Sequence, residues 1–382
     1  MSFASLGLPQ SLVQKLSKQE FAKPYPIQEK AIPAILSKKD VLGIAKTGSG
    51  KTASYVLPIL ANLQGRREVE KDRSVDVLVV VPTRELAVQV KDVFYQFSSE
   101  SGGDVRTLAV FGGVSINPQM KAMFGVNVLV ATPGRLLELV ESKAVSISEI
   151  ETLVLDEADK MLNLGFEEEM NQIFALLPQN RQNLLFSATL NKEVKNINKV
   201  LLRNPLVINV EETETADIEL IEQTAYLIEE EKKGPLLRYI IKENNFEQVL
   251  IFVSSTFRAD AVVDKLKKNG FDCMATHSKK SQGARTDALT KFKNGKLAIL
   301  VATDLLGRGI DIQGLPCVIN YELPRSPKDY IHRIGRTGRA EMNGKAISIL
   351  TTEDLHHFKV IQKKMKKRVD LTYTDDLNLS SY

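Results

Sequence analysis

Residues 45–52, with the sequence AKTGSGKT, have the residue types and spacing of a phosphate-binding loop. They follow a short apolar run and precede a helical pattern, so the backbone N–H groups of a glycine-rich turn would lie at the positive end of a helix. In this pattern the lysine contacts the β- and γ-phosphates and the next hydroxyl binds Mg²⁺, here Lys51 and Thr52. The strict pattern has glycine at position 45, where this chain has alanine. The alternative, a plain strand-to-helix turn, is disfavoured by the strand–helix context.

An acidic segment, DEAD at residues 156–159, ends the apolar run TLVL. A carboxylate at the carboxyl end of a parallel strand faces the same crevice as a phosphate loop. Asp156 is therefore expected to hold Mg²⁺ through water, and Glu157 to orient and deprotonate an attacking water. Alone, such a segment is more often a solvated acidic turn, but the phosphate loop favours the functional interpretation. Gln28 presents a donor and an acceptor that match the N6/N7 edge of adenine, a weak signal by itself.

The second half of the chain contains YIHRIGRTGR at residues 330–339, which places three arginines at a spacing of three. Planar guanidinium groups suit the charge that develops on a transferred phosphoryl group. An exposed basic turn is the alternative. A further glycine-rich segment, ATDLLGRGID at residues 302–311, also follows an apolar run. Because this half lacks a phosphate-loop pattern, we expect it to supply arginines to a nucleotide held by the first half.

These segments need elements that position them, and the apolar pattern indicates which ones. Short β-branched runs without alternation alternate with amphipathic helical stretches, which is typical of strands buried on both faces of a parallel sheet. Strand followed by helix, repeated along the chain, predicts an α/β fold with a mostly parallel sheet flanked by helices. The runs are 41–45, 77–82, 107–113, 128–133, 152–159 and 183–189, and then 248–253, 272–277, 297–304, 317–322 and 345–351.

The length of 382 residues predicts two or three domains at about 150 residues each. We place a first domain at 1–210, an acidic linker at 211–222, a second domain at 223–368 and a polar C-terminal tail at 369–382. For the basic run at 363–368 and the polar tail after it, we favour a fraying helix end and a disordered terminus over weak attraction to phosphate.

Composition restricts the class of protein. Hydrophobic residues make up 43% and charged residues 26%, as in ordinary soluble globular proteins, and the net charge is only +4,. Cys273 and Cys317 form no CxxC pattern, which excludes a common structural zinc site and indicates a reducing compartment. We see no secretory signal and no apolar run near the ~18 residues of a membrane span. A cytoplasmic location is expected.

Taken together, these motifs resemble those of the DEAD-box ATP-dependent RNA helicases of superfamily 2, and the style of residues 324–340 is similar to RhlE-type bacterial members. Phe21, Pro24, Ile27 and Gln28 match the Q motif, and Phe3 its upstream aromatic. The other matches are the phosphate loop, PTREL (82–86), Gly112 with Gly113, TPGR (132–135), DEAD, SAT (187–189), LIFV (250–253), Gln282 with Arg285, and the two glycine-rich segments of the second half. Tyr25, Glu20, Ser278 and Gly307 depart from common family residues, and none removes a charged catalytic group.

The resemblance implies two RecA-like domains that close on ATP, Mg²⁺ and RNA, which is single-stranded or a short duplex. Catalytic roles fall on Lys51, Asp156, Glu157, Arg336 and Arg339, and Mg²⁺ on Thr52 and Asp156. The implied nucleotide-binding residues are Phe21, Gln28, Thr47, Gly48, Ser49, Gly50, Lys51, Thr52 and Asp311. RNA contacts are implied for Pro82, Thr83, Arg84, Gly113, Thr132, Arg135 and Thr303, and coupling of the two ligands for Asp159, Ser187, Thr189 and His332.

Three functions remain open at this point. The first is an RNA-stimulated ATPase that unwinds short duplexes or remodels RNA–protein complexes. The second is a non-unwinding, ATP-gated RNA clamp, which uses the same motifs. The third is a DNA helicase or translocase, which Gln28 together with DEAD disfavours. We expect a monomeric core, with RNA-bound proteins as possible partners and no membrane association.

Overall fold

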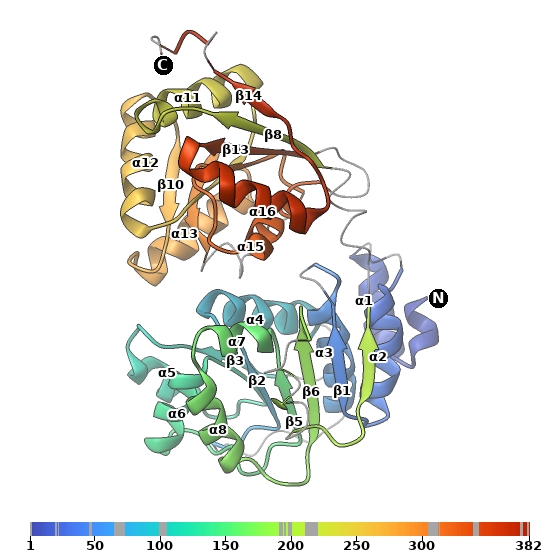
Figure 1. Cartoon of the computed structure of the whole chain (residues 1–382). Coiled ribbons are helices and arrows are strands. Elements are labelled where there is room, and N and C mark those ends of the chain that lie inside the picture. Colours follow the sequence, from blue (N-terminus) through green and yellow to red (C-terminus); the bar gives the residue numbers. More distant parts are fainter. Residues whose placement is uncertain are drawn as a thin grey trace. The chain divides into compact units, whose positions relative to one another are not determined.

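The computed structural model describes the chain except for residues 1, 20, 22, 46–47, 65–72, 99–104, 191–193, 195, 198–200, 211–220, 305–311, 313, 339–343, 375–376 and 380–381. The chain forms two compact units, Met1–Glu211 and Glu212–Tyr382 (Figure 1). Within the described residues, each unit contains one seven-stranded sheet in which every strand pair is parallel. The predicted α/β class, two parallel sheets flanked by helices, is therefore confirmed.

The first sheet has the strand order β3-β4-β2-β5-β6-β1-β7. Its strands are β1 (Val41–Ile44), β2 (Val77–Val80), β3 (Thr107–Val110), β4 (Val128–Ala131), β5 (Thr152–Leu155), β6 (Gln182–Ser187) and β7 (Leu206–Asn209). The helices are η1 (Phe3–Leu6), α1 (Gln10–Lys18), α2 (Pro26–Leu36), α3 (Lys51–Leu63), α4 (Arg84–Ser98), α5 (Ile116–Ala122), α6 (Pro133–Glu141), α7 (Ala158–Asn163) and α8 (Glu167–Leu176).

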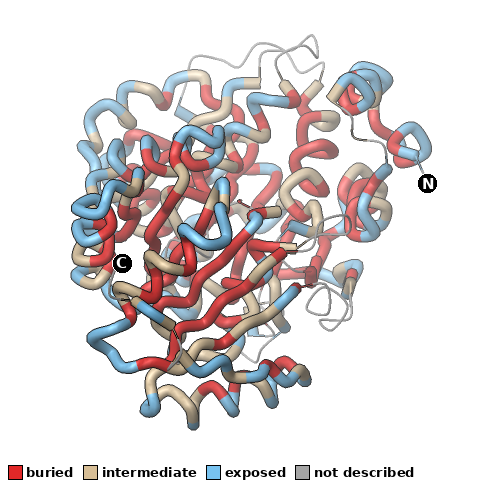
Figure 2. Tube along the Cα trace, turned by 90° about the horizontal axis from the view of Figure 1, so that it is seen from above, coloured by how far each residue is buried: buried red, intermediate tan, exposed pale blue. Residues whose placement is uncertain are grey.

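Both faces of this sheet are buried, which explains the unbroken apolar runs in the sequence. Along β2, Val77 and Val79 belong to one hydrophobic cluster, while Leu78 and Val80 belong to the cluster on the opposite face. The first cluster is completed by α2, α3 and α4, and the second by α6, α7 and α8. Figure 2 shows the resulting pattern of buried strands with exposed segments outside them.

The second sheet has the strand order β10-β11-β9-β12-β13-β8-β14. Its strands are β8 (Ile221–Leu227), β9 (Val249–Val253), β10 (Cys273–Thr276), β11 (Ile299–Thr303), β12 (Cys317–Asn320), β13 (Gly344–Leu350) and β14 (Leu371–Tyr373). The helices are η2 (Glu230–Lys232), α11 (Lys233–Asn244), α12 (Thr256–Lys268), α13 (Gln282–Lys293), α15 (Pro327–Ile334), η3 (Thr352–Asp354) and α16 (Leu355–Met365). No helix within the described ranges is both long enough and apolar enough to span a bilayer.

The predicted linker falls almost entirely on residues 211–220, outside the described part of the chain. Its last two residues, Ile221 and Glu222, already belong to β8. They pair with Gly344 and Lys345 of β13.

The expectation of a disordered terminus is wrong for the described residues of the tail. Strand β14 pairs with β8 at the edge of the second sheet. Beyond it, Leu377 and Leu379 pack against the hydrophobic cluster formed with α11 and α12. The Tyr382 hydroxyl donates to Glu243 Oε1 at 2.7 Å, and its ring lies edge-on to Tyr239. We call the described residues of 371–382 the C-terminal strap.

We predict that replacing both Leu377 and Leu379 by alanine destabilises the second unit by roughly 1–2 kcal/mol, because apolar surface returns to water. Urea unfolding of the double variant measures this loss. Thr372→Ala, at an exposed position of β14, is the matched control and should change the free energy of unfolding little. Equal stability of the double variant and the wild type would contradict the packing of the strap.

Candidate functional site

The strand order of the first sheet explains why distant motifs meet. Strands β5, β6 and β1 are neighbours, so their carboxyl ends lie side by side. Residues 156–159 follow β5, Ser187 ends β6, and the phosphate loop follows β1. Ligands of open α/β sheets bind outside these carboxyl ends.

The phosphate loop leads directly into α3. Gly48 and Gly50 both have φ of 85°, and Gly50 is the N-cap of the helix. A Cβ at Gly50 would lie 2.5 Å from Gln28 Nε2, so only glycine fits this turn. Ser49 lies between the two glycines, whereas Thr47 is outside the described residues. The first turn of α3 therefore presents its N–H groups at the carboxyl edge of the sheet.

Gln28 connects the start of α2 to this loop through two hydrogen bonds. Its Nε2 donates to the Gly50 carbonyl at 3.1 Å, and its Oε1 accepts from the Tyr25 backbone N–H at 2.9 Å. The side chain is only 1% exposed. Phe21, predicted to stack on adenine, lies edge-on to Phe97 with ring centroids 5.8 Å apart.

Lys51 and Asp156 form the buried centre of the site. Lys51 is 7% exposed, and its Nζ has no hydrogen-bond partner among the described residues. Asp156 accepts hydrogen bonds from the Tyr55 hydroxyl and from the Glu157 backbone N–H, both at 2.9 Å. Burial raises the pKa of Asp156 to about 6, against the opposing charge of Lys51. A buried ammonium without a partner fits a phosphate, and the oxygens of Asp156 and Thr52 are ligands that suit Mg²⁺.

Glu157, the N-cap of α7, has a left-handed backbone with φ of 55° and ψ of 46°. The residue is 6% exposed. Both carboxylate oxygens accept from Lys160 Nζ at 2.8 Å. The predicted base is therefore held by a cation one helical turn further along.

Asp159 connects residues 156–159 to the end of β6. The Thr189 hydroxyl donates to Asp159 Oδ2 at 2.9 Å, and the Ser187 hydroxyl donates to the Thr189 carbonyl at 2.8 Å. The structure thus brings three of the four predicted coupling residues together. His332 lies on α15 of the second unit.

The predicted RNA-contacting residues of the first unit lie at the other half of the same sheet edge, after β2, β3 and β4. Pro82, Thr83 and Arg84 follow β2, Gly113 follows β3, and Thr132 with Arg135 follows β4.

Two close contacts organise this half. A Cβ at Gly113 would lie 2.0 Å from an Arg84 guanidinium nitrogen, so the arginine packs directly on the glycine. Arg135 is 5% exposed and donates to Glu138 and to the Val114 carbonyl. Its guanidinium therefore holds the loop after β3.

In the second unit the three spaced arginines differ in role. Arg333 donates to both carboxylate oxygens of Asp304, at 2.5 and 2.9 Å, and also to Asn320 and the Glu322 carbonyl. It anchors the ends of β11 and β12. Arg336 is 3% exposed in the turn after α15, and Thr303 ends β11. Arg339 and Asp311 lie outside the described residues.

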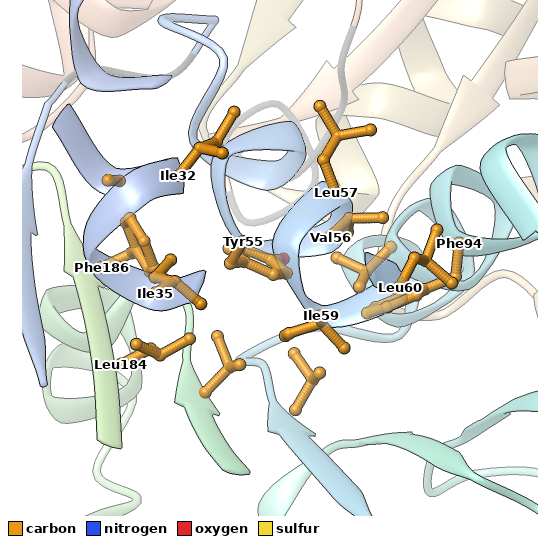
Figure 3. Close-up of a cluster of buried hydrophobic side chains, with 14 of the residues drawn as sticks. Ile32, Ile35, Tyr55, Val56, Leu57, Ile59, Leu60, Phe94, Leu184 and Phe186 are labelled. Atoms are coloured by element: carbon orange, nitrogen blue, oxygen red, sulfur yellow. The ribbon is translucent and has the colours of Figure 1, made fainter. Parts of the chain in front are cut away.

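Sequence reasoning missed Tyr55 and Lys160. Tyr55 follows Lys51 by one helical turn, which puts both on one face of α3 toward Asp156. Its apolar surroundings in Figure 3 explain why its spacing indicates only a core residue. Lys160 follows Glu157 by three residues, a spacing at which opposite charges meet on a helix.

The comparisons with known proteins agree with this geometry. The DEAD/DEAH box helicase family matches residues 25–197, and the helicase conserved C-terminal domain matches residues 231–341. The ATP-dependent RNA helicase CshA of Listeria monocytogenes is 36% identical over 368 residues, which cover 96% of this chain and 69% of that protein. This chain belongs to the DEAD-box helicase family. The DEAD-box ATP-dependent RNA helicase CshA of Streptococcus pneumoniae is 39% identical, covering 97% of this chain and 69% of that protein.

Solved structures of DEAD-box helicases share the fold. Dbp5 of S. cerevisiae bound to RNA and ADP BeF3 matches with a TM-score of 0.84 and 29% identity, covering 98% of this chain and 96% of that one. A DEAD box protein from Methanococcus jannaschii matches with a TM-score of 0.55 and 34% identity, covering 97% and 99%. The predicted family is confirmed, and with it the use of a nucleotide. The RhlE-type subgroup stays a prediction.

We predict that Asp156→Asn stabilises the ligand-free helicase at neutral pH. A folded pKa of about 6 lies above the unfolded value near 3.9, so the folded state binds the extra proton between these values and stability falls as pH rises through them. At pH 7.5 the ionised carboxylate costs on the order of 3 kcal/mol, which the asparagine avoids.

Denaturant unfolding of the first unit in EDTA, without nucleotide, tests this at pH 5 and pH 7.5. The variant should gain stability relative to the wild type at both pH values, and about twice as much at pH 7.5 as at pH 5, because at pH 5 the wild type has lost only part of this stability. Asp92→Asn, an exposed carboxylate on α4, is the control. A gain that is the same at both pH values would contradict a raised pKa for Asp156.

Proposed function

We propose that this DEAD-box protein is an ATP-dependent RNA helicase whose RNA-stimulated ATP hydrolysis separates short RNA duplexes or remodels RNA–protein complexes. Family membership supports this activity. The single observation that carries the assignment of the site is the buried, unpartnered Lys51 ammonium beside Asp156 and Glu157. A monomeric core and a cytoplasmic location stay predictions of the proposal.

In the first unit, Lys51 and the N–H groups at the start of α3 bind the phosphates of ATP. Asp156 and Thr52 hold Mg²⁺, which neutralises charge on the phosphate oxygens when it is bound. Glu157 accepts the proton of the attacking water, which requires Lys160 to release at least one carboxylate oxygen. Gln28 recognises adenine, with Phe21 against the base. The hydrogen bond from Gln28 to the Gly50 carbonyl connects the adenine site to the phosphate loop.

In the second unit, Arg336 and Arg339 act on the charge that develops at the γ-phosphate, and Asp311 contacts the ribose. Closure of the two units on both ligands would assemble this site. Asp159, Thr189 and Ser187 couple ATP hydrolysis to RNA binding, and His332 of the second unit takes part in this coupling.

RNA binds along the other half of the first sheet edge, at Pro82, Thr83, Arg84, Gly113 and Thr132, and at Thr303 of the second unit. The buried and engaged guanidinium of Arg135 supports a role in holding the loop after β3, so we assign its effect on RNA to that loop.

We predict that Glu157→Gln abolishes multiple turnover while ATP and RNA stay bound, because the amide keeps the shape of the carboxylate and loses the base. Lys51→Ala should instead weaken ATP binding, since it removes the cation that meets the phosphates. The measurements are the steady-state ATPase rate with and without RNA and the affinity for a fluorescent ATP analogue. Lys291→Ala, which breaks an exposed lysine–aspartate pair on α13, is the control.

Wild-type turnover by Glu157→Gln would overturn the assignment of the base. Equal stimulation by RNA and by DNA of the same sequence would overturn the choice of RNA. Stimulated hydrolysis without displacement of a short RNA duplex would identify an ATP-gated clamp in place of an unwinding enzyme.

We predict that ATP and RNA together bring the two units closer, and that each ligand raises the affinity for the other. Lys121→Cys on α5 and Lys359→Cys on α16 offer exposed attachment points for a dye pair. Selective labelling is feasible because Cys273 and Cys317 are buried, and burial raises their thiol pKa values to about 11 and about 12. Energy transfer that stays constant in the apo, ATP-analogue, RNA and ternary states would refute closure.

A further inference from the structure

Phe257 presents its ring to solvent at the start of α12. The residue is 82% exposed, more than any other exposed large hydrophobic residue of the described chain. Helix α12 is held on the sheet by Ala259, Val262, Val263 and Leu266, and Phe257 contributes nothing to that buried face. Exposure of a large aromatic surface to water is unfavourable. Packing within this unit therefore does not account for a phenylalanine at position 257.

The position of Phe257 follows from the second sheet. Val253, the last residue of β9, pairs with Thr303, the last residue of β11. Helix α12 begins three residues after Val253, so Phe257 lies at the carboxyl edge that also carries Thr303.

The neighbouring loop comes from β10. Asp260 lies one turn after Phe257 on the same face of α12. Its Oδ1 is 2.8 Å from Lys280 Nζ and 3.1 Å from His277 Nε2. The first turn of α12 is therefore next to residues 277–281, which lead into α13.

The surroundings of Phe257 suit a nucleic-acid backbone. Lys279 is exposed and Lys280 is 37% exposed. Helices α12 and α13 both begin at this edge, with Ser255 and Ser281 as N-caps whose hydroxyls accept from Arg258 N–H and Ala284 N–H. Lysines and helix N-termini attract phosphates, although Lys280 is shared with Asp260, and the exposed ring of Phe257 on the first turn of α12 offers a surface on which a base can stack.

We propose that Phe257 is an RNA-binding residue whose ring stacks on a base of the bound strand at the edge of the second unit. The inference rests on the proposed RNA helicase function and adds a contact to it. Stacking on a phenyl ring accepts any base. Phe257 therefore raises affinity for single strands without selecting a sequence.

The first experiment measures affinity. Phe257→Ala should weaken binding of a labelled single-stranded RNA by about 5- to 100-fold in fluorescence anisotropy with a non-hydrolysable ATP analogue. The KM for ATP at saturating RNA should stay at the wild-type value, and Phe257→Tyr should restore affinity. Tyr95→Ala, which removes a 70% exposed aromatic residue on α4, is the matched control and should bind RNA as the wild type does.

The second experiment reports the contact directly. The chain contains no tryptophan, so Phe257→Trp introduces a single indole whose emission should be quenched by RNA and left unchanged by the ATP analogue alone. Unchanged emission together with wild-type affinity of Phe257→Ala, while RNA still binds, would overturn this inference and leave the proposed function intact. Failure of the wild type to bind RNA would overturn both.

Discussion

The buried carboxylate of Asp156 is the group on which the arrangement of the first unit depends. A carboxylate that is removed from water needs donors and an opposite charge from the protein. Tyr55, the Glu157 N–H and Lys51 supply them, and two of these belong to α3. Helix α3 must therefore begin at the carboxyl ends of the sheet, and its apolar packing against one face of the sheet sets its position.

The core around Tyr55 fixes that distance. Tyr55 is fully buried, and its ring centroid lies 5.3 Å from that of Phe186 on β6. Figure 3 shows Ile32, Ile35 and Leu184 around the same helix. Because close-packed cores deform little, the position of Lys51 relative to Asp156 is set by apolar side chains that never touch a ligand.

Much of this arrangement could be predicted from the sequence, because its strongest signals are local. The buried runs along β2 and β5 indicate parallel strands, and residues at strand ends then fall at one edge. The predictions that failed concern contacts between residues that are far apart in the sequence. Leu371, Leu377 and Leu379 lie in a polar segment whose partners, β8 and α11, are more than a hundred residues away. Arg333 and Arg336 are the same residue type at one spacing, so the sequence alone does not show that Arg333 pairs with Asp304 and anchors two strands.

The ion pair between Lys160 and Glu157 has a consequence for ATP hydrolysis. If Glu157 is the base that we propose, Lys160 has to release one of its carboxylate oxygens to a water before hydrolysis. Because the ion pair lies within one turn of α7, this release would be a step that the binding of ATP does not itself require.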